Sequence, residues 1–184
     1  MLYTQQTNSI FKNNYIELQN NLVKNEQTNQ VFKHIKIIEK NTIKPGSVIL
    51  CEYKKKIMLL ELYRYGINAI SWEFPRGYIE DNESLSECAI RELYEEANII
   101  FNKETDQIIQ LGETAVNSSI MASKVSLFLV KINHTIDIKL QNNENIKSIS
   151  WITQKEIQDY IKNGIIIDSF TINTLMFYNL TYNY

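Results

Sequence analysis

The segment from Ser84 to Ala97 constrains the fold of this chain more than any other. Its apolar residues recur at the spacing of one helical face, with polar residues between them: Leu85, Cys88, Ala89, Leu93 and Ala97. A helix with one apolar stripe is stable when that stripe packs against another layer of structure. The spacing therefore predicts an amphipathic helix over 84–97 that covers one face of a sheet.

The segments around this helix supply the strands of such a sheet. Apolar runs bounded by turn residues predict strands over 47–53, 57–64, 70–74, 107–111, 125–132 and 146–152. A second helix, capped by Thr153, should end at Asn163–Gly164, and a last helix should start at Asp168 or Ser169. Strands and helices do not alternate regularly. This favours an α/β (α+β) fold, with a mixed sheet and helices on its faces.

The first 45 residues differ from the rest of the chain. They are polar, and they hold two short strand-like stretches, 15–18 and 31–38, which predict a β-hairpin or an edge sheet. The Pro45–Gly46 turn separates them from the following strands. We therefore expect two parts, an N-terminal strand region over 1–45 and a main domain over 46–184.

Composition narrows the class of function. The 184 residues hold 19 Lys and Arg against 21 Asp and Glu, a net charge of −2, so the basic excess of a nucleic-acid-binding protein is missing and nucleic acid is disfavoured as a partner. No apolar run approaches the roughly 18 residues that span a bilayer, and the first residues lack the pattern of a secretion signal. We expect a cytoplasmic protein that makes no membrane contact. Its two cysteines, Cys51 and Cys88, lack metal-ligand spacing and should be reduced.

The polar side of the 84–97 helix concentrates acidic residues. At about 100° per residue, Glu92 and Glu96 lie about 40° apart around the helix, and Glu95 lies about 60° to the other side of Glu92. Their mutual repulsion and the negative end of the helix dipole both disfavour this arrangement. A divalent cation reverses both effects, and oxygen ligands suit Mg²⁺, with Mn²⁺ as the alternative. The competing interpretation is a solvated acidic face on which Arg91 pairs with Glu87 or Glu95.

The pattern around this helix resembles the box of the Nudix hydrolase superfamily. That box is Gly, five residues, Glu, seven residues, then Arg-Glu-apolar-any-Glu-Glu-any-Gly-apolar. Here Gly77 and Glu83 begin the pattern, and residues 91–99 complete it with the sequence RELYEEANI. Every defined position matches except the last Gly, which is Asn98, a residue that also adopts the left-handed conformation at helix ends. The resemblance implies an α/β/α sandwich and metal-dependent hydrolysis of a phosphoanhydride bond.

The residues before the box resemble the ADP-ribose and ADP-sugar pyrophosphatase branch of that superfamily. Arg64 precedes the segment Glu73-Phe74-Pro75-Arg76-Gly77, in the order typical of this branch. The resemblance implies a nucleoside diphosphate linked to another group as substrate, with AMP and a sugar phosphate as products from ADP-ribose. It also implies a homodimer formed through the N-terminal strands. The loop over 113–119 lacks the proline that many of these enzymes carry. The resemblance therefore does not define how the nucleotide part of the substrate would be recognised.

Other functions within the superfamily compete with this prediction. An RNA 5′-end or dinucleoside polyphosphate pyrophosphohydrolase would share the box. A non-catalytic Nudix-like nucleotide sensor would be expected to have lost one of Glu92, Glu95 or Glu96, and all three are present.

The resemblance also assigns roles to individual residues. The implied metal ligands are the carboxylates of Glu92, Glu95, Glu96, Glu83 and Glu144 and the backbone carbonyl of Arg76. Glu144 or a box glutamate such as Glu95 would be the catalytic base, and Arg91 would orient the carboxylates. Glu83 has two alternatives to metal binding, an ion pair with Arg91 and a charge at the helix N-terminus.

The remaining candidates would contact the substrate. Arg64 and Arg76 would bind the phosphates, because guanidinium groups bind phosphate oxygens well. Glu73 and Gly77 would line the same site. Trp72 would stack on the base, although packing in the core is the more common role for such a residue.

Overall fold

The computed structural model describes residues 1–40, 42–136 and 146–182. The chain forms two compact units, one from residues 1–45 and 115–125 and the other from residues 46–114 and 126–184. In the part of the chain that is described, no helix is both long and apolar enough to cross a membrane.

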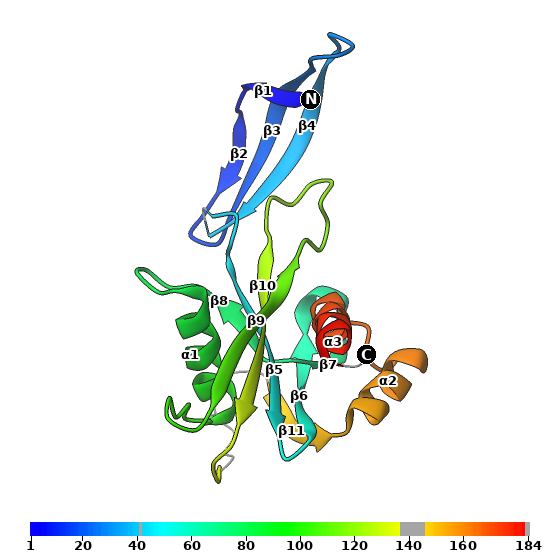
Figure 1. Ribbon diagram of the computed structural model, residues 1–184. Helices are drawn as coiled ribbons and strands as arrows, with labels where there is room; N and C mark the ends of the chain where they lie inside the picture. Colours follow the sequence, from blue (N-terminus) through cyan, green and yellow to red (C-terminus); the bar gives the residue numbers. More distant parts are fainter. Residues whose placement is uncertain (41, 137–145, 183–184) are drawn as a thin grey trace. The chain divides into compact units, whose positions relative to one another are not determined.

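The first unit is a four-stranded antiparallel sheet (Figure 1). Its strands are β1 (Leu2–Gln6), β2 (Ser9–Lys12), β3 (Ile16–Asn25) and β4 (Val31–Glu39). β3 pairs with β4 along its length and, on its other edge, with β2 and β1 in turn. Residues 115–125 join this unit through Ile37, whose backbone N–H donates to Ile120 O at 2.7 Å and whose carbonyl accepts from Ala122 N at 2.8 Å.

The second unit contains a seven-stranded sheet. The strands are β5 (Gly46–Tyr53), β6 (Lys56–Arg64), β7 (Ala69–Glu73), β8 (Arg76–Tyr78), β9 (Gln107–Thr114), β10 (Val125–Ile132) and β11 (Ile146–Ile152). The order is β11-β6-β5-β10-β9, with β7 added to β6 and β8 added to β5. β10 runs parallel to β5, whereas β6 runs antiparallel to β5, β7 and β11. The predicted mixed sheet is therefore confirmed.

Helices cover both faces of this sheet, as Figure 1 shows, with α1 (Leu85–Ala97) on one side and α2 (Gln154–Lys162) and α3 (Ser169–Tyr182) on the other. The apolar stripe of α1 packs on alternate residues of β5, in a buried cluster that includes Ile49, Cys51, Ala89 and Leu93. Glu52, which points to the opposite face, accepts a hydrogen bond from Tyr178 of α3 at 2.6 Å. The second unit is therefore the predicted α/β/α sandwich.

The helix ends follow the local chemistry of the sequence. Ser84 caps α1 through a reciprocal pair of bonds with Glu87, and Thr153 caps α2 in the same way with Glu156. Asn98, at the position of the missing box glycine, has φ 56° and ψ 29°, so the left-handed helix end is kept as predicted. The Ser84 cap and the left-handed Asn98 thus define where α1 begins and ends.

Candidate active site

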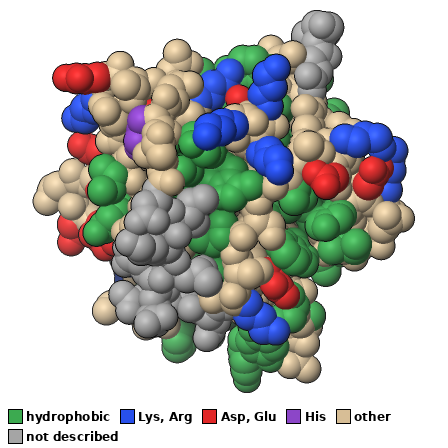
Figure 2. Space-filling model, turned by 90° about the horizontal axis from the view of Figure 1, so that it is seen from below, with side chains coloured by type: hydrophobic (Ala, Val, Ile, Leu, Met, Phe, Trp, Pro, Cys, Tyr) green, Lys and Arg blue, Asp and Glu red, His purple; other side chains and the backbone are tan. Residues whose placement is uncertain are grey.

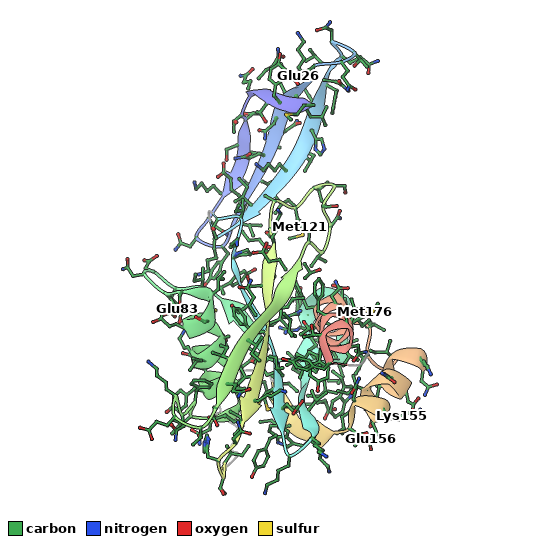
Figure 3. All side chains as sticks on the ribbon, in the orientation of Figure 1. Glu26, Glu83, Met121, Lys155, Glu156 and Met176 are labelled. Atoms are coloured by element: carbon green, nitrogen blue, oxygen red, sulfur yellow. The ribbon has the colours of Figure 1, made fainter. Side chains whose placement is uncertain are left out.

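Arg91 is the centre of an ion-pair cluster on α1. Its guanidinium contacts Glu83 at 2.8 and 3.0 Å, Glu92 at 2.6 Å and Glu95 at 2.9 Å, and it donates to the carbonyl of Tyr78 at 2.7 Å. The hydrogen bonds with Glu83 and Glu92 outweigh partial burial and raise the pKa of Arg91 above its usual range. Arg91 in turn lowers the pKa of Glu83. Figure 3 marks Glu83 beside α1, where the ion pair with Arg91 holds it.

Two of the box glutamates are buried, Glu92 with 6% of its surface exposed and Glu96 with 3%. A Cβ atom on residue 77 would collide with the Glu92 carboxylate, so Gly77 is the residue that lets β8 approach the helix this closely. Glu96 Oε2 accepts the backbone N–H of Arg76 at 3.1 Å. The turn into β8 and the polar face of α1 therefore meet at these two carboxylates.

Glu95 lies differently from the other two. Its side chain is 46% exposed, and its contact is with Arg91. The helical spacing correctly placed the three glutamates on neighbouring parts of one face, but it did not show that two are buried and one faces solvent. Glu87, which was one expected partner of Arg91, is committed to the cap of α1.

The donor set suits a hard divalent cation, because it consists of carboxylate oxygens beside a glycine whose missing Cβ leaves room at Glu92. Within residues 1–40, 42–136 and 146–182, no three His, Cys, Asp or Glu side chains lie close enough to form a ready-made metal site. Arg91 supplies the positive charge at Glu92 and Glu95 instead. A cation would therefore share these carboxylates with Arg91. Glu144, the remaining predicted ligand and candidate base, lies outside the described residues.

A second charged network adjoins the first at Arg76. Glu73 is 2% exposed. Its carboxylate accepts hydrogen bonds from Arg64 Nε and Nη2 at 3.0 and 2.6 Å, and it forms an ion pair with Arg76 Nη2 at 2.8 Å. Burial opposes ionisation of Glu73, but these partners outweigh it and lower the pKa of the carboxyl. Arg76 Nη1 also donates to Asp168 at 2.9 Å, and its guanidinium stacks on the Phe170 ring at 4.7 Å.

The two arginines differ in what they can still offer to a substrate. Both Nη atoms of Arg76 are engaged, one by Glu73 and one by Asp168. The Arg64 side chain is 35% exposed, and its Nη1 makes no hydrogen bond to any described residue. Arg64 is therefore better placed than Arg76 to contact a phosphate.

Trp72 does not join this network. Glu73 and Ser71 are buried on one face of β7, and Trp72 lies between them on the alternate face. Its ring packs edge-to-face on Tyr160 of α2, with 6.3 Å between centroids. Of the two roles considered for Trp72, the geometry favours packing.

Sequence reasoning missed Asp168 as part of this region. The sequence predicted Asp168 or Ser169 as the start of the last helix. α3 begins at Ser169, and Asp168 caps it by accepting from Thr171 N at 2.8 Å. Its contact with Arg76 joins residues 92 positions apart, which no local spacing reveals. The available signal was an acid at a helix start in a chain whose three arginines, Arg64, Arg76 and Arg91, all need acidic partners.

The fold and this site define a class of proteins: α/β/α sandwiches in which a helix rich in glutamate lies against a short glycine-containing strand. A family model for the NUDIX domain matches residues 45–170, which is more than half of the chain. The chain therefore belongs to the Nudix family.

Comparisons with individual proteins agree with this assignment. The m7GpppN-mRNA hydrolase of Saccharomyces cerevisiae (strain ATCC 204508 / S288c) is 28% identical over 132 residues, 71% of this chain and 13% of that protein. An RNA pyrophosphohydrolase of Histophilus somni (strain 2336) is 40% identical over 52 residues, 28% of this chain and 25% of that protein. The chain thus spans a quarter or less of the length of these relatives. The crystal structure of an ADP compounds hydrolase shares the fold, with a TM-score of 0.75 and 13% identity over 98% of this chain and 93% of that one.

Proposed function

We propose that this protein is a metal-dependent hydrolase that cleaves the pyrophosphate bond of a nucleoside diphosphate linked to another group. ADP-ribose or a related ADP-sugar is the favoured substrate, and AMP and a sugar phosphate are the products. Mg²⁺ is the proposed metal, with Mn²⁺ as the alternative.

One observation carries the proposal. Glu92 and Glu96 are buried on α1 where Gly77 lets the backbone of β8 approach them. Buried carboxylates are costly unless strong partners or a cation compensate for lost hydration. The adjoining Arg64 offers a guanidinium edge to phosphate, so the same region combines negative groups for a cation with a positive group for an anion.

The roles of the residues follow from this geometry. Glu92, Glu95 and Glu96 would hold the cation, with Glu144 completing the set. A bound divalent cation would neutralise phosphate charge and lower the pKa of the attacking water. Arg91 fixes the direction of Glu92 and Glu95, and its contact with Glu83 keeps the guanidinium in place. Arg64 would bind a phosphate oxygen, and Glu73 would hold Arg64 for that contact.

Two carboxylates compete for the role of general base. Glu95 is the exposed member of the helical set, so it can reach a water molecule without displacing packed side chains. Glu144 is the acid predicted to lie in the loop before β11. Glu95→Gln and Glu144→Gln should each be compared for kcat across pH. A general base must be ionised to accept a proton, so kcat falls as the pH drops through its pKa. The base is the residue whose replacement removes this fall in kcat at low pH.

An RNA 5′-end pyrophosphohydrolase is the second candidate. The names of the sequence relatives favour it, since they act on capped mRNA or on RNA. Figure 2 shows several Lys and Arg side chains beside an apolar patch on one face, a surface that could contact the phosphates of a longer chain. The net charge of −2 and the similarity in fold to an ADP compounds hydrolase favour the small substrate.

We also propose that the N-terminal strands of residues 1–45 mediate a homodimer. Large apolar side chains of this unit are exposed, among them Ile10, Phe11, Tyr15, Phe32 and Ile35. Exposed apolar side chains gathered on one small sheet are typical of an association surface. Light scattering should give twice the mass of 21.6 kDa, and Phe11→Glu together with Ile35→Glu should give the single mass.

A hydrolysis screen tests the proposed activity. The purified protein is incubated with Mg²⁺ or Mn²⁺ and ADP-ribose, other nucleotide sugars, dinucleoside polyphosphates and 5′-triphosphate RNA. We expect the highest kcat/KM with ADP-ribose or an ADP-sugar. Glu96→Gln should lower kcat at least about 100-fold, which corresponds to about 2.7 kcal/mol of barrier. Preference for RNA would select the second candidate, and an unchanged rate in Glu96→Gln would remove the assignment of the metal site.

A further inference from the structure

Asp168, the residue before α3, touches the candidate site from the opposite face of the sheet. We infer that Asp168 is a positioning residue for the 73–77 segment and, through that segment, for the contact between Arg76 and Glu96. The inference deepens the proposed function and rests on it, because Glu96 is one of the proposed metal ligands.

The two carboxylate oxygens of Asp168 have separate tasks. Oδ1 accepts from Arg76 Nη1 at 2.9 Å, and Oδ2 accepts both the backbone N–H and the hydroxyl of Thr171 at 2.8 Å. The Thr171 hydroxyl, which donates a hydrogen bond to Asp168, accepts the backbone N–H of Phe74 at 3.0 Å. Asp168 thus holds the segment twice, by a side chain at Arg76 and by the backbone at Phe74.

These contacts of Asp168 and Thr171 with the 73–77 segment, called the clamp below, are shielded from water. Thr171 is fully buried, and only 11% of the Asp168 side chain is exposed. Hydrogen bonds that involve a charged group and are removed from solvent are stronger and more directional than exposed ones. The clamp can therefore fix the direction of the backbone rather than follow it.

The ends of the 73–77 segment are paired in the sheet, Glu73 with Leu60 of β6 and Arg76 with Val48 of β5. Between β7 and β8 lie only Phe74 and Pro75, and the carbonyl of Pro75 accepts from Ile49 N at 2.8 Å. The next backbone N–H, that of Arg76, donates to Glu96 at 3.1 Å. A change of the backbone direction at Phe74 and Pro75 would move this N–H away from Glu96. Together with these strand pairs, Asp168 restrains the segment through Thr171, which accepts from Phe74 N, and through the Arg76 side chain.

The same geometry gives Arg64 and Arg76 different roles. Arg76 has both Nη atoms held by Glu73 and Asp168, so its part is to keep the segment in place. Arg64 keeps an exposed edge for phosphate. Loss of the clamp should therefore reduce metal affinity and kcat while leaving KM unchanged, whereas Arg64→Ala should raise KM.

Asp168→Asn is the decisive variant, because Asn caps a helix as well as Asp does but cannot give Arg76 an anionic partner. Asp159→Asn is the matched control, since Asp159 lies on the exposed face of α2, where it pairs with Lys155 at 2.9 Å. Mn²⁺ affinity is measured by calorimetry, and kcat and KM are measured with ADP-ribose. Replacing groups that orient metal ligands typically costs about 10–100-fold, so we expect about tenfold weaker Mn²⁺ binding and tenfold lower kcat in Asp168→Asn. KM should stay within about twofold, and Asp159→Asn should match the wild type.

Thr171 provides a second test that keeps the ion pair intact. Thr171→Val removes the hydroxyl that accepts from Phe74 and should weaken Mn²⁺ binding, while Thr171→Ser keeps the hydroxyl and should restore it. Wild-type Mn²⁺ affinity and kcat in both Asp168→Asn and Thr171→Val would overturn the inference, as would a rise in KM with kcat unchanged. If the wild type hydrolyses no phosphoanhydride yet Asp168→Asn still weakens Mn²⁺ binding, the proposed function fails and the positioning role stands.

Discussion

Adding a single methyl group at residue 77 tests the closest contact of the candidate site. In Gly77→Ala the new Cβ would collide with the carboxylate of Glu92. That carboxylate cannot move cheaply, because Glu92 is 6% exposed and its Oε1 lies 2.6 Å from Arg91 Nη1. Overpacking a well-filled site costs about 1–3 kcal/mol, and loss of the Glu92–Arg91 contact places this variant in the upper half, about 2–3 kcal/mol.

The assay is thermal and urea unfolding followed by circular dichroism. For a chain of this size, about 1 kcal/mol corresponds to a shift of roughly 2–4 °C, so Tm should fall by roughly 4–12 °C. Gly66→Ala is the matched control, because no atom lies within 4 Å of the Cβ that it adds. Gly66→Ala should leave Tm unchanged or raise it slightly. Equal Tm values for Gly77→Ala and the wild type would refute the argument that the site is built on this close approach.

Three further predictions concern stability and reactivity. Because the pKa of Glu73 is lowered in the fold, its ionised form stabilises the protein at neutral pH, and this contribution is lost as the pH falls through the lowered pKa. Glu73→Gln should therefore lower the free energy of unfolding by about 2–3 kcal/mol at pH 7, and the gap should narrow below about pH 4 in urea titrations. Thr153→Ala removes the cap of α2 and should cost about 1 kcal/mol by the same method, with no change in Mn²⁺ affinity. Burial raises the pKa of the Cys88 thiol to about 11, so in the native protein it should react with a thiol reagent far more slowly than in urea; equal rates would contradict the packing around α1.

Local patterns in the sequence were enough for most of the second unit. The apolar spacing of α1 fixed which face packs on the sheet, and the capping residues Ser84 and Thr153 fixed where two helices begin. Asn98 was correctly expected to keep the left-handed helix end. These features are local, because each depends on residues within one or two helical turns.

What the sequence missed depends on long-range contacts or on weak patterns. β1 and β2 are exposed along their whole length. Their sequences therefore lack the alternation of apolar and polar residues from which a strand is predicted. The sequence predicted where the last helix starts but not where it ends, and that helix extends to Tyr182. The pairing of Asp168 with Arg76 and the burial of Glu92 and Glu96 arise only when distant segments meet.

The central claim is that the buried glutamates of α1 hold a divalent cation for phosphoanhydride hydrolysis. Electron paramagnetic resonance of Mn²⁺, which reports the free ion, tests it directly in the wild type, in the Glu92→Gln, Glu96→Gln double variant, and in Glu104→Gln, which replaces an exposed glutamate elsewhere. We predict that the wild type and Glu104→Gln bind Mn²⁺ alike and that the double variant binds at least about tenfold more weakly. Equal Mn²⁺ binding by all three proteins would contradict the claim.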